Sequence, residues 1–424
     1  MNWGWRRCLG LVCLLHLMLA ASDVTADDWP RFLGPRGEAV DMDAQVPTEW
    51  SADRNVVWKA ELPGPGTSSP ILLGDRIFLT CYSGYGVSER DPGEQENLLH
   101  HVVCLDRSSG EVVWERRSKP RLPEQEYRGF IALHGYASAT PVTDGRYVYT
   151  FFGRSGVWAY GIDGSLKWSI GVGENTHGWG SAASPILHRD MVIVNASVES
   201  KRIVALDKTT GKLVWQVPGI RDSWSTPLIV ELPDGSSELV VSMHSKIIGV
   251  DPNSGEVLWH CLGVEDYVCP SVIAEGDVAY VTGGRGAAVV IAVRCGGRGD
   301  VNETHRLWEL RQTPKVSTPV VHDGLMYWVG HRGIAHCVDT GNGELVYRER
   351  VGGLGTVYGS TVLAGGKLIA FSREKGAVVF APGRQYEELA RNDLGDKSIF
   401  NATPAIDGNR LLIRSDRYLY CLGE

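Results

Sequence analysis

The feature that most constrains this chain is a sequence unit that recurs every 42 to 49 residues along most of its length. Each unit opens with small residues beside a proline, and a threonine takes the place of the proline in one unit. From the second start onward, the spacings are 44, 42, 43, 49, 42 and 43 residues. The eight starts are Pro70, Pro141, Pro185, Pro227, Pro270, Pro319, Thr361 and Pro404.

One unit, residues 225–259, shows what each repeat should form. Four short runs rich in β-branched residues alternate with turn sequences such as Pro-Asp-Gly-Ser, and no run has a helical period. Four strands in a repeat of about 40–45 residues are typical of a β-propeller blade. The sequence therefore predicts an all-β, eight-bladed propeller of four-stranded antiparallel blades.

The end of the unit is as regular as its start. A glycine is followed four residues later by tryptophan or tyrosine in the segments Gly110–Trp114, Gly164–Trp168, Gly211–Trp215, Gly255–Trp259 and Gly343–Tyr347. We expect these rings to pack between blades. The preceding turns open with Asp106, Asp207, Asp251 and Asp339. Aspartate accepts backbone N–H groups in such turns, so we interpret these carboxylates as structural rather than as a metal site.

The two ends of the repeat region predict how the ring closes. Residues Thr403–Leu422 supply only about three strands, whereas Asn55–Leu62 has the sequence of a last strand, with Trp58 at the tryptophan position. An N-terminal strand should therefore complete the last blade and remove two free sheet edges. The predicted organisation is a signal peptide at 1–26, a lead-in segment at 27–54 that packs across the ring, and one propeller domain at 55–424.

The first 26 residues have the pattern of a secretory signal. Arg6 and Arg7 precede an apolar run from Leu9 to Ala21, and Val24–Ala26 offers a small-residue cleavage site. No cysteine lies in a lipobox at the end of the apolar run, and no later segment is apolar enough to span a bilayer. We expect a non-lipidated periplasmic or secreted protein of the bacterial envelope.

The cysteines and the charge exclude further classes. Seven cysteines remain after residue 26, and Cys261 and Cys269 flank one loop where a disulfide could form. Their spacing does not match a zinc site. The net charge of −8 argues against a nucleic-acid partner. The oligomeric state is not set by these patterns.

A candidate ligand site follows from the geometry of a blade. The loop that enters the first strand and the loop between the second and third strands open on one face, so aromatic and basic residues of several blades should meet at one mouth of the channel. Aromatic rings offer flat apolar surface, and arginine offers fixed donors for carboxylate, sulfate or phosphate. The alternative is that these residues are ordinary solvated loop residues. The candidate ligand-binding residues are Trp179, Trp224, Tyr267, Tyr358, Tyr136, His134, His177, Arg154, Arg285 and Arg332.

Two segments carry a resemblance to a known family. Ala205–Trp215 reads Ala-Leu-Asp-Lys-Thr-Thr-Gly-Lys-Leu-Val-Trp and resembles the repeat of pyrroloquinoline-quinone-type propellers. Trp29–Pro35 resembles the opening of secreted bacterial proteins described as BamB-like, named after the propeller subunit of the outer-membrane protein assembly machinery. The resemblance covers the chain from Trp29 onward and implies the fold more specifically than the function.

The resemblance raises the question of a quinone cofactor. Quinoprotein dehydrogenases of this superfamily typically carry adjacent cysteines beside the quinone and a Ca²⁺ held by carboxylate and amide oxygens. No two cysteines here are adjacent, and no such oxygen cluster stands out. We therefore predict no cofactor, and no catalytic or metal-binding residue is nominated.

These observations lead to one main hypothesis and two alternatives. The main hypothesis is a non-catalytic exported scaffold that binds an envelope protein or an extended peptide segment. The alternatives are a quinone-linked oxidoreductase and a protein that binds or processes an anionic glycan.

Overall fold

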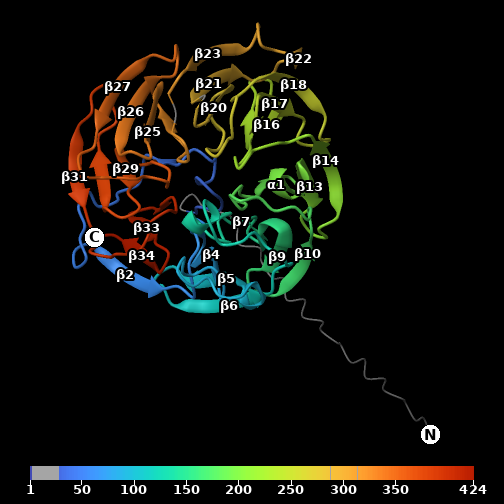
Figure 1. Cartoon of the computed structure of the whole chain (residues 1–424), viewed down its shortest axis with the longest axis vertical. Coiled ribbons are helices and arrows are strands. Elements are labelled where there is room, and N and C mark those ends of the chain that lie inside the picture. Colours follow the sequence, from blue (N-terminus) through green and yellow to red (C-terminus); the bar gives the residue numbers. More distant parts are fainter. Residues whose placement is uncertain (2–27, 287, 313) are drawn as a thin grey trace.

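The computed structural model describes residue 1 and residues 28–286, 288–312 and 314–424 of the chain. The signal peptide predicted at 1–26 therefore lies outside the described residues, apart from Met1. Eight β-sheets stand around a central channel like the blades of a propeller (Figure 1). The predicted eight-bladed all-β fold is confirmed.

Blades 1 to 4 follow the order of the repeats. Blade 1 contains β3 (Ile71–Leu73), β4 (Arg76–Ser83), β5 (Leu99–Asp106) and β6 (Val112–Ser118). Blade 2 contains β7 (Val142–Thr143), β8 (Tyr147–Phe151), β9 (Val157–Gly161) and β10 (Leu166–Ile170). Blade 3 contains β11 (Ile186–His188), β12 (Met191–Ala196), β13 (Arg202–Asp207) and β14 (Leu213–Pro218). Blade 4 contains β15 (Leu228–Glu231), β16 (Ser237–Met243), β17 (Lys246–Val250) and β18 (Val257–Leu262).

Blades 5 to 8 complete the ring. Blade 5 contains β19 (Ile273–Glu275), β20 (Val278–Gly283), β21 (Val289–Arg294) and β23 (Arg306–Leu310). Blade 6 contains β24 (Val320–His322), β25 (Leu325–Val329), β26 (Ile334–Asp339) and β27 (Leu345–Arg350). Blade 7 contains β28 (Val362–Ala364), β29 (Lys367–Phe371), β30 (Ala377–Phe380) and β31 (Glu388–Asn392). Blade 8 contains β32 (Ala405–Asp407), β33 (Arg410–Arg414), β34 (Tyr418–Leu422) and the N-terminal β2 (Val56–Glu61).

The ring closes as the sequence predicts, because β2 pairs antiparallel with β34 and places Trp58 opposite Cys421. Two short strands extend other blades. The strand β1 (Val40–Asp41) pairs parallel with β28 on the inner edge of blade 7. The strand β22 (Gly299–Asp300), from the long turn of blade 5, pairs parallel with β18 of blade 4. The chain therefore joins neighbouring repeats as well as building each one.

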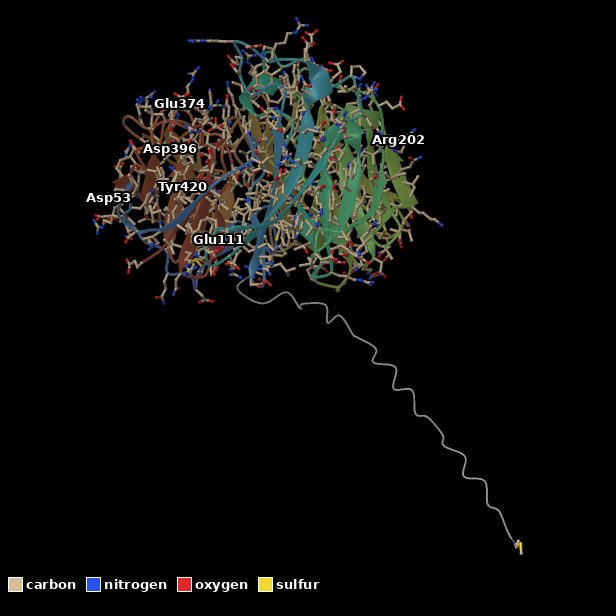
Figure 2. All side chains as sticks on the ribbon, turned by 90° about the horizontal axis from the view of Figure 1, so that it is seen from below. Asp53, Glu111, Arg202, Glu374, Asp396 and Tyr420 are labelled. Carbon is tan, nitrogen blue, oxygen red and sulfur yellow. The ribbon has the colours of Figure 1, made fainter. Side chains whose placement is uncertain are left out.

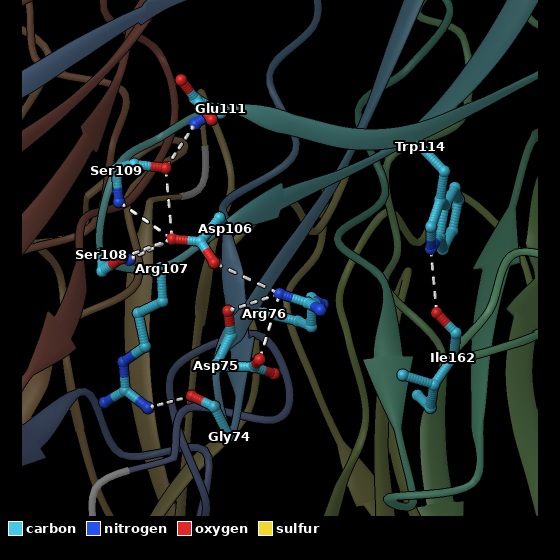
Figure 3. A network of polar contacts seen from close by, with 10 residues as sticks. All are labelled: Gly74, Asp75, Arg76, Asp106, Arg107, Ser108, Ser109, Glu111, Trp114 and Ile162. Carbon is cyan, nitrogen blue, oxygen red and sulfur yellow. Dashed lines mark hydrogen bonds and ion pairs between the residues drawn. The ribbon is translucent and has the colours of Figure 1, made fainter.

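The recurring tryptophan at the end of the unit joins one blade to the next at five junctions. The Trp114 indole Nε1 donates 2.9 Å to the Ile162 carbonyl of blade 2 (Figure 3). A Cβ atom on Gly164 would lie 2.8 Å from that same ring, so only glycine leaves room for it. Four other indole N–H groups donate in the same way to a backbone carbonyl of the next blade. Trp58 is joined to blade 1, Trp168 to blade 3, Trp215 to blade 4 and Trp308 to blade 6. We call these five bonds the outer tryptophan ring.

The turn aspartates have the structural role that the sequence indicates. Figure 3 shows one Asp106 carboxylate oxygen accepting the backbone N–H groups of Ser108 and Ser109, both at 3.0 Å. These hydrogen bonds, with that from the Ser108 hydroxyl first, lower the pKa of Asp106 to about 2. The same carboxylate group also meets Arg76. The turn is therefore fixed locally.

The lead-in segment runs across the ring from blades 1 and 2 to blade 7. Trp29 bridges to Leu72 of blade 1, and the Pro30 carbonyl accepts the Thr143 N–H of blade 2. Further along, the Ala39 carbonyl accepts an N–H from blade 7. As expected from its sequence, the segment packs across the ring, and it covers one end of the channel.

Within the described residues, four short helices and two insertions lie on the opposite face of the ring, which we call the upper face. The insertions of blade 1 contain η1 (Gln95–Asn97) and η2 (Ile131–Leu133), while η3 (Gly153–Ser155) and α1 (Ser197–Ser200) follow the second strands of blades 2 and 3. Figure 2 places Glu374, from the second-to-third loop of blade 7, near this upper face and Glu111 near the lower one. None of the helices in the described part of the chain has the length and apolar character needed to cross a bilayer.

Candidate functional site

The upper end of the channel opens into a cavity of about 380 Å³ that residues from all eight blades line. Phe32 of the lead-in segment also lines it, and this segment crosses the lower face of the ring. We call this space the cup, with its mouth on the upper face and its floor at Phe32. Its volume is near the lower end of the range of about 300–1,000 Å³ for ligand pockets.

The wall of the cup contains a closed ring of hydroxyl groups, one from each blade. The backbone N–H of each member donates to the side-chain hydroxyl of the member in the next blade, over distances of 2.9–3.3 Å. The last bond, from Thr403 to Ser69, closes the circle. Serine and threonine alternate in the order Ser69, Thr140, Ser184, Thr226, Ser271, Thr318, Ser360 and Thr403. We call this ring the hydroxyl belt.

An aromatic cluster lies at the mouth. The Trp179 ring lies edge-on to Tyr267, with centroids 4.3 Å apart, and its centroid is 4.9 Å from that of Trp224 and 5.0 Å from that of Phe130. Trp224 is 7% exposed, and its Nε1 donates 2.7 Å to the Gly180 carbonyl. The entering loops of blades 2 to 5 therefore hold one another in place through ring contacts.

His134 fixes this cluster rather than carrying charge. Burial lowers the pKa of His134, so the imidazole is neutral at pH 7. Its Nε2 lies 2.6 Å from the Trp179 carbonyl, which can only accept, and its Nδ1 lies 2.6 Å from the Ser138 hydroxyl. The neutral ring therefore donates through Nε2 and accepts through Nδ1.

The charges around the cup have one sign. Arg285, Lys315 and His331 line it, and none of the lining residues is an aspartate or glutamate, although the whole chain has a net charge of −8. Burial and then the charges of Lys315 and Arg332 lower the pKa of His331, so its imidazole is neutral at pH 7 and the positive charge comes from Arg285 and Lys315. The guanidinium of Arg373 lies 4.8 Å from the Tyr358 ring centroid. The mouth is therefore a positive and aromatic surface on an acidic protein.

A further cation lies beside the floor. The Arg31 guanidinium forms no ion pair or hydrogen bond with another described residue, and its Nε atom is buried. Burial lowers its pKa to about 10, so it remains charged at pH 7. A half-buried cation without a counter-charge adds positive potential beneath the cup.

The structure divides the ten candidate residues into two groups. Six of them line the cup: His134, Trp179, Trp224, Tyr267, Arg285 and Tyr358. Three others, Tyr136, Arg154 and His177, line a separate cavity of only about 30 Å³ at the junction of blades 1 to 3. Arg332 neighbours His331 at the rim without lining the cup. Their part in binding stays a prediction. Lys315 and His331 belong to the same two loop classes without being among the ten candidates, and sequence reasoning missed Asn401 and the whole hydroxyl belt as cup residues.

Two carboxyl groups lie at the smaller cavity. Glu199 on α1 is buried against the Ser181 hydroxyl, and burial raises its pKa to about 7. Burial, and then the charge of Glu199, raise the pKa of Glu124 to about 7, which Arg154 partly counters. This pair joins the second insertion of blade 1 to blades 2 and 3.

Blade 1 also brings together three residues with the connectivity of a hydrolase triad. The Ser83 hydroxyl lies 2.7 Å from His101 Nε2, and His101 Nδ1 lies 2.5 Å from a Glu115 carboxylate oxygen. Arg117 occupies both oxygens of that carboxylate. The His101 side chain is only 3% exposed, and neither Ser83 nor His101 lines the cup or the smaller cavity. We interpret the arrangement as a cross-strand bond network of β4, β5 and β6.

All seven described cysteines are free thiols, so the disulfide considered for Cys261 and Cys269 is absent from this part of the chain. Cys269 lines the cup, and burial raises its pKa to about 12. The thiol is therefore protonated and a poor nucleophile at pH 7.

The fold and its repeats place the chain in the class of pyrroloquinoline-quinone-type repeat propellers. The family model of the outer membrane protein assembly factor BamB matches residues 100–261 and 229–382. These matches span more than half of the chain, so the protein belongs to this family. No curated protein sequence matches the chain.

Solved structures share the fold at low sequence identity. BamB from Moraxella catarrhalis is 14% identical, with a TM-score of 0.59, covering 87% of this chain and 97% of that chain. The computationally designed Ika8 protein is 10% identical, with a TM-score of 0.59 and coverages of 87% and 100%. Quinohemoprotein alcohol dehydrogenase from Comamonas testosteroni is 11% identical, with a TM-score of 0.60 and coverages of 94% and 81%.

The quinone cofactor that this fold class suggests does not fit the cup. Calcium takes carboxylate, amide and carbonyl oxygens, and the lining offers the amide of Asn401 but no carboxylate. No group of three histidine, cysteine or acidic side chains in the described residues could hold a metal ion. The donor set of the cup instead suits an anionic ligand without a bridging cation.

Proposed function

We propose that this protein is an exported, non-catalytic propeller that captures an acidic group of another cell-envelope component in the cup. The observation that supports this most directly is the lining of the cup, which combines free cations with aromatic rings and contains no carboxylate. The family to which the chain belongs carries the name of an outer-membrane assembly factor, which supports an envelope location and a partner there.

The cations at the mouth are available to a ligand. Neither Arg285 nor Lys315 takes part in an ion pair with a described residue. The nearest loop acid, Asp266, already accepts the backbone N–H groups of Tyr267, Arg285 and Gly286. A carboxylate, sulfate or phosphate that enters the mouth would therefore meet unpaired positive charge in a partly desolvated site, where such contacts are stronger than in water.

The site is also held ready for binding. The aromatic cluster and the hydroxyl belt are fixed by contacts between blades, so little loop ordering accompanies capture. The closed floor restricts the occupant to a terminal unit or the tip of a chain, because Phe32 and the lead-in segment cover the other end. A partner would therefore present a short acidic end rather than a segment threaded through the ring.

The experiment compares charge reversal at the mouth with charge reversal on the outer wall. The immobilised chain, its R285E/K315E variant and its R202E variant would each be incubated with envelope extract. Arg202 is exposed on the outer wall of blade 3 and bonds only to Gln216 among the described residues (Figure 2). We expect acidic components to be retained by the parent and R202E proteins and to be reduced at least tenfold on R285E/K315E. Equal retention by all three would overturn the proposal.

The same material tests the non-catalytic part of the proposal. A fluorophosphonate probe reacts with an activated serine, and Ser83 is the described serine with a histidine and a carboxylate in series. We expect no labelling above that of S83A, because the His101 imidazole is buried and Arg117 neutralises the carboxylate. Specific labelling at Ser83 would show that the protein has a catalytic site in blade 1.

A further inference from the structure

The hydroxyl hydrogens of the belt are not used by the hydrogen bonds that join the blades. Each of the eight hydroxyl oxygens accepts one backbone N–H from the preceding blade. A hydroxyl group that accepts one bond still has its own hydrogen to donate. None of the eight donates to a described protein acceptor, and all eight line the cup. The wall therefore presents a ring of O–H donors to whatever occupies the channel.

The cup also contains one unused acceptor. The Asn401 side chain donates through Nδ2 to the Leu133 carbonyl at 2.7 Å, while its Oδ1 atom is buried and has no partner among the described residues. Buried polar atoms without a partner are costly, so such an atom favours a ligand or water that donates to it. An occupant with both acceptor oxygens and hydroxyl hydrogens would satisfy the belt and Asn401 together.

The upper part of the cup adds two more requirements. The half-buried rings of Trp179, Tyr267 and Tyr358 offer flat apolar faces or edges for a ring-shaped ligand. Arg285 and Lys315 favour a negative group at the rim. The donors of the belt are therefore deep and neutral, whereas the cations are at the mouth.

We propose that the ligand is a carboxylated sugar, a uronate residue at the end of an acidic glycan, with its hydroxyl-bearing ring in the cup and its carboxylate at the mouth. This inference rests on the proposed function and names the chemistry of its ligand. A sugar ring provides acceptors for the belt and a hydroxyl for Asn401, and its apolar face packs on the aromatic rings. A free acidic peptide side chain supplies the carboxylate but few groups for the belt.

The test measures binding of D-glucuronate to the full chain by calorimetry, with D-glucose and acetate as matched probes and an oligoglutamate peptide as competitor. Glucose retains the ring without the charge, and acetate retains the charge without the ring. We expect glucuronate to bind at least tenfold more tightly than either probe. We also expect a glucuronate-ended disaccharide to bind at least as tightly as the monosaccharide.

Variants separate the two parts of the site. R285M/K315M should weaken glucuronate at least tenfold and leave glucose unchanged, because only the charge is removed. T226V should weaken glucuronate and glucose together, by about threefold to tenfold, because valine keeps the shape and removes one belt hydroxyl. T226S restores the hydroxyl and should bind as the parent does. Since T226V also removes the acceptor of the Ser184 N–H, each variant is first checked by its melting temperature, and T318V provides a second belt variant.

The outcomes distinguish the ligand class from the proposed function. If acetate and oligoglutamate bind as tightly as glucuronate, and R285M/K315M weakens all three, the capture of acidic groups stands and the uronate inference is wrong. If folded T226V and T318V proteins bind glucuronate as the parent does, the belt is only structural and the inference is wrong. If no anionic probe binds at millimolar concentration, both proposals fail.

Discussion

The molecule contains two hydrogen-bonded rings that join its blades, and they differ in regularity. The hydroxyl belt spans all eight junctions around the channel, with serine and threonine in alternation. The outer tryptophan ring spans five junctions. At blade 4, the Trp259 indole instead donates to the Glu238 carboxylate of its own blade, and blade 7 has Ala390 opposite Val379 at the equivalent register position. The outer tryptophan bond is therefore replaced or missing at some junctions, whereas the hydroxyl belt is present at all eight.

The difference has a physical basis. At the outer edge the blades diverge, so local additions such as β22 can stand in for a lost ring contact. Near the axis, each backbone N–H of the belt donates to a hydroxyl of the next blade, so a missing acceptor would leave a buried donor unpaired. The inner ring can therefore tolerate less variation, and it is also the ring that lines the cup.

Removing the closing strand should have the largest effect on stability. Deletion of residues 27–62 removes the ladder between β2 and β34 together with the Trp58 bond to blade 1, but it leaves the belt bond from Thr403 to Ser69. We expect a loss of roughly 5 kcal/mol or more in unfolding free energy, because the strands β1 and β2 are lost together with the core rings of Trp29, Trp50 and Trp58. Thermal unfolding by circular dichroism measures it. A truncated protein that melts cooperatively at the parent temperature would show that the belt alone holds the ring closed.

The buried carboxyl groups of Glu124 and Glu199 should make stability depend on pH. In the folded chain, burial raises the pKa of both Glu124 and Glu199 from 4.5 to about 7. The unfolded carboxyls ionise first as pH rises, so stability is highest below about pH 4.5 and falls until about pH 7. The loss is on the order of 3 kcal/mol in total, with both groups coupled.

Urea unfolding at pH 5, 6, 7 and 8 checks this dependence. E199Q should flatten the curve, because an amide does not ionise and still accepts from Ser181. E126Q is the matched control, because Glu126 is exposed and pairs with Arg128. Identical pH profiles for the parent and E199Q would show that Glu199 is ionised in the folded protein throughout.

Phenylalanine at two tryptophans compares a regular outer junction with the exceptional one. W114F removes one bond to a carbonyl and should cost about 1 kcal/mol. W259F should cost about 2–3 kcal/mol, because Trp259 is completely buried and its partner Glu238 is a buried carboxylate. Gly296 N–H and Arg298 still bond to Glu238, which limits the loss. Equal losses from the two variants, measured by urea unfolding, would contradict the special role of the blade 4 junction.

Most of the fold could be predicted from the sequence because each blade carries its own copy of the repeated pattern and can be recognised separately. The closing strand was recognisable because Asn55–Leu62 repeats the pattern of a last strand, with Trp58 at the tryptophan position, and because the C-terminal repeat supplies only about three strands. The belt was missed because its members were treated only as small residues next to proline. Their alternation is visible in the sequence, although Ser271 follows its proline and Ser360 has none nearby, which obscures the register.

The candidate site was predictable only in part. The type of loop on which Trp179 and Arg285 lie correctly indicates that they share a face of the ring. It does not determine how far each side chain points toward the axis of the channel. Arg154 and His177 instead meet the second insertion of blade 1, whose packing has no counterpart in the repeat. The alternative of a solvated loop residue is wrong for Trp224, because its ring is buried and bonded to the Gly180 carbonyl. Phe32 could not be placed, since its position depends on the path of the lead-in segment across the ring.

A single belt variant should have a small effect on stability and gives the most information about the inner ring. T226V removes the acceptor of the Ser184 N–H and should cost about 1–2 kcal/mol, while T226S should cost a few tenths. T318V removes the acceptor of the Ser271 N–H, and Ser271 is also the acceptor of the Thr226 N–H. These two sites therefore share a partner, whereas T226V and T403V do not. If the belt acts as a connected ring, the T226V/T318V double variant should deviate from additivity by more than about 0.5 kcal/mol, and T226V/T403V should not. Additive losses in both pairs, measured by urea unfolding, would show that the belt is eight separate hydrogen bonds, and its regularity would then have to be explained by the ligand that the cup holds.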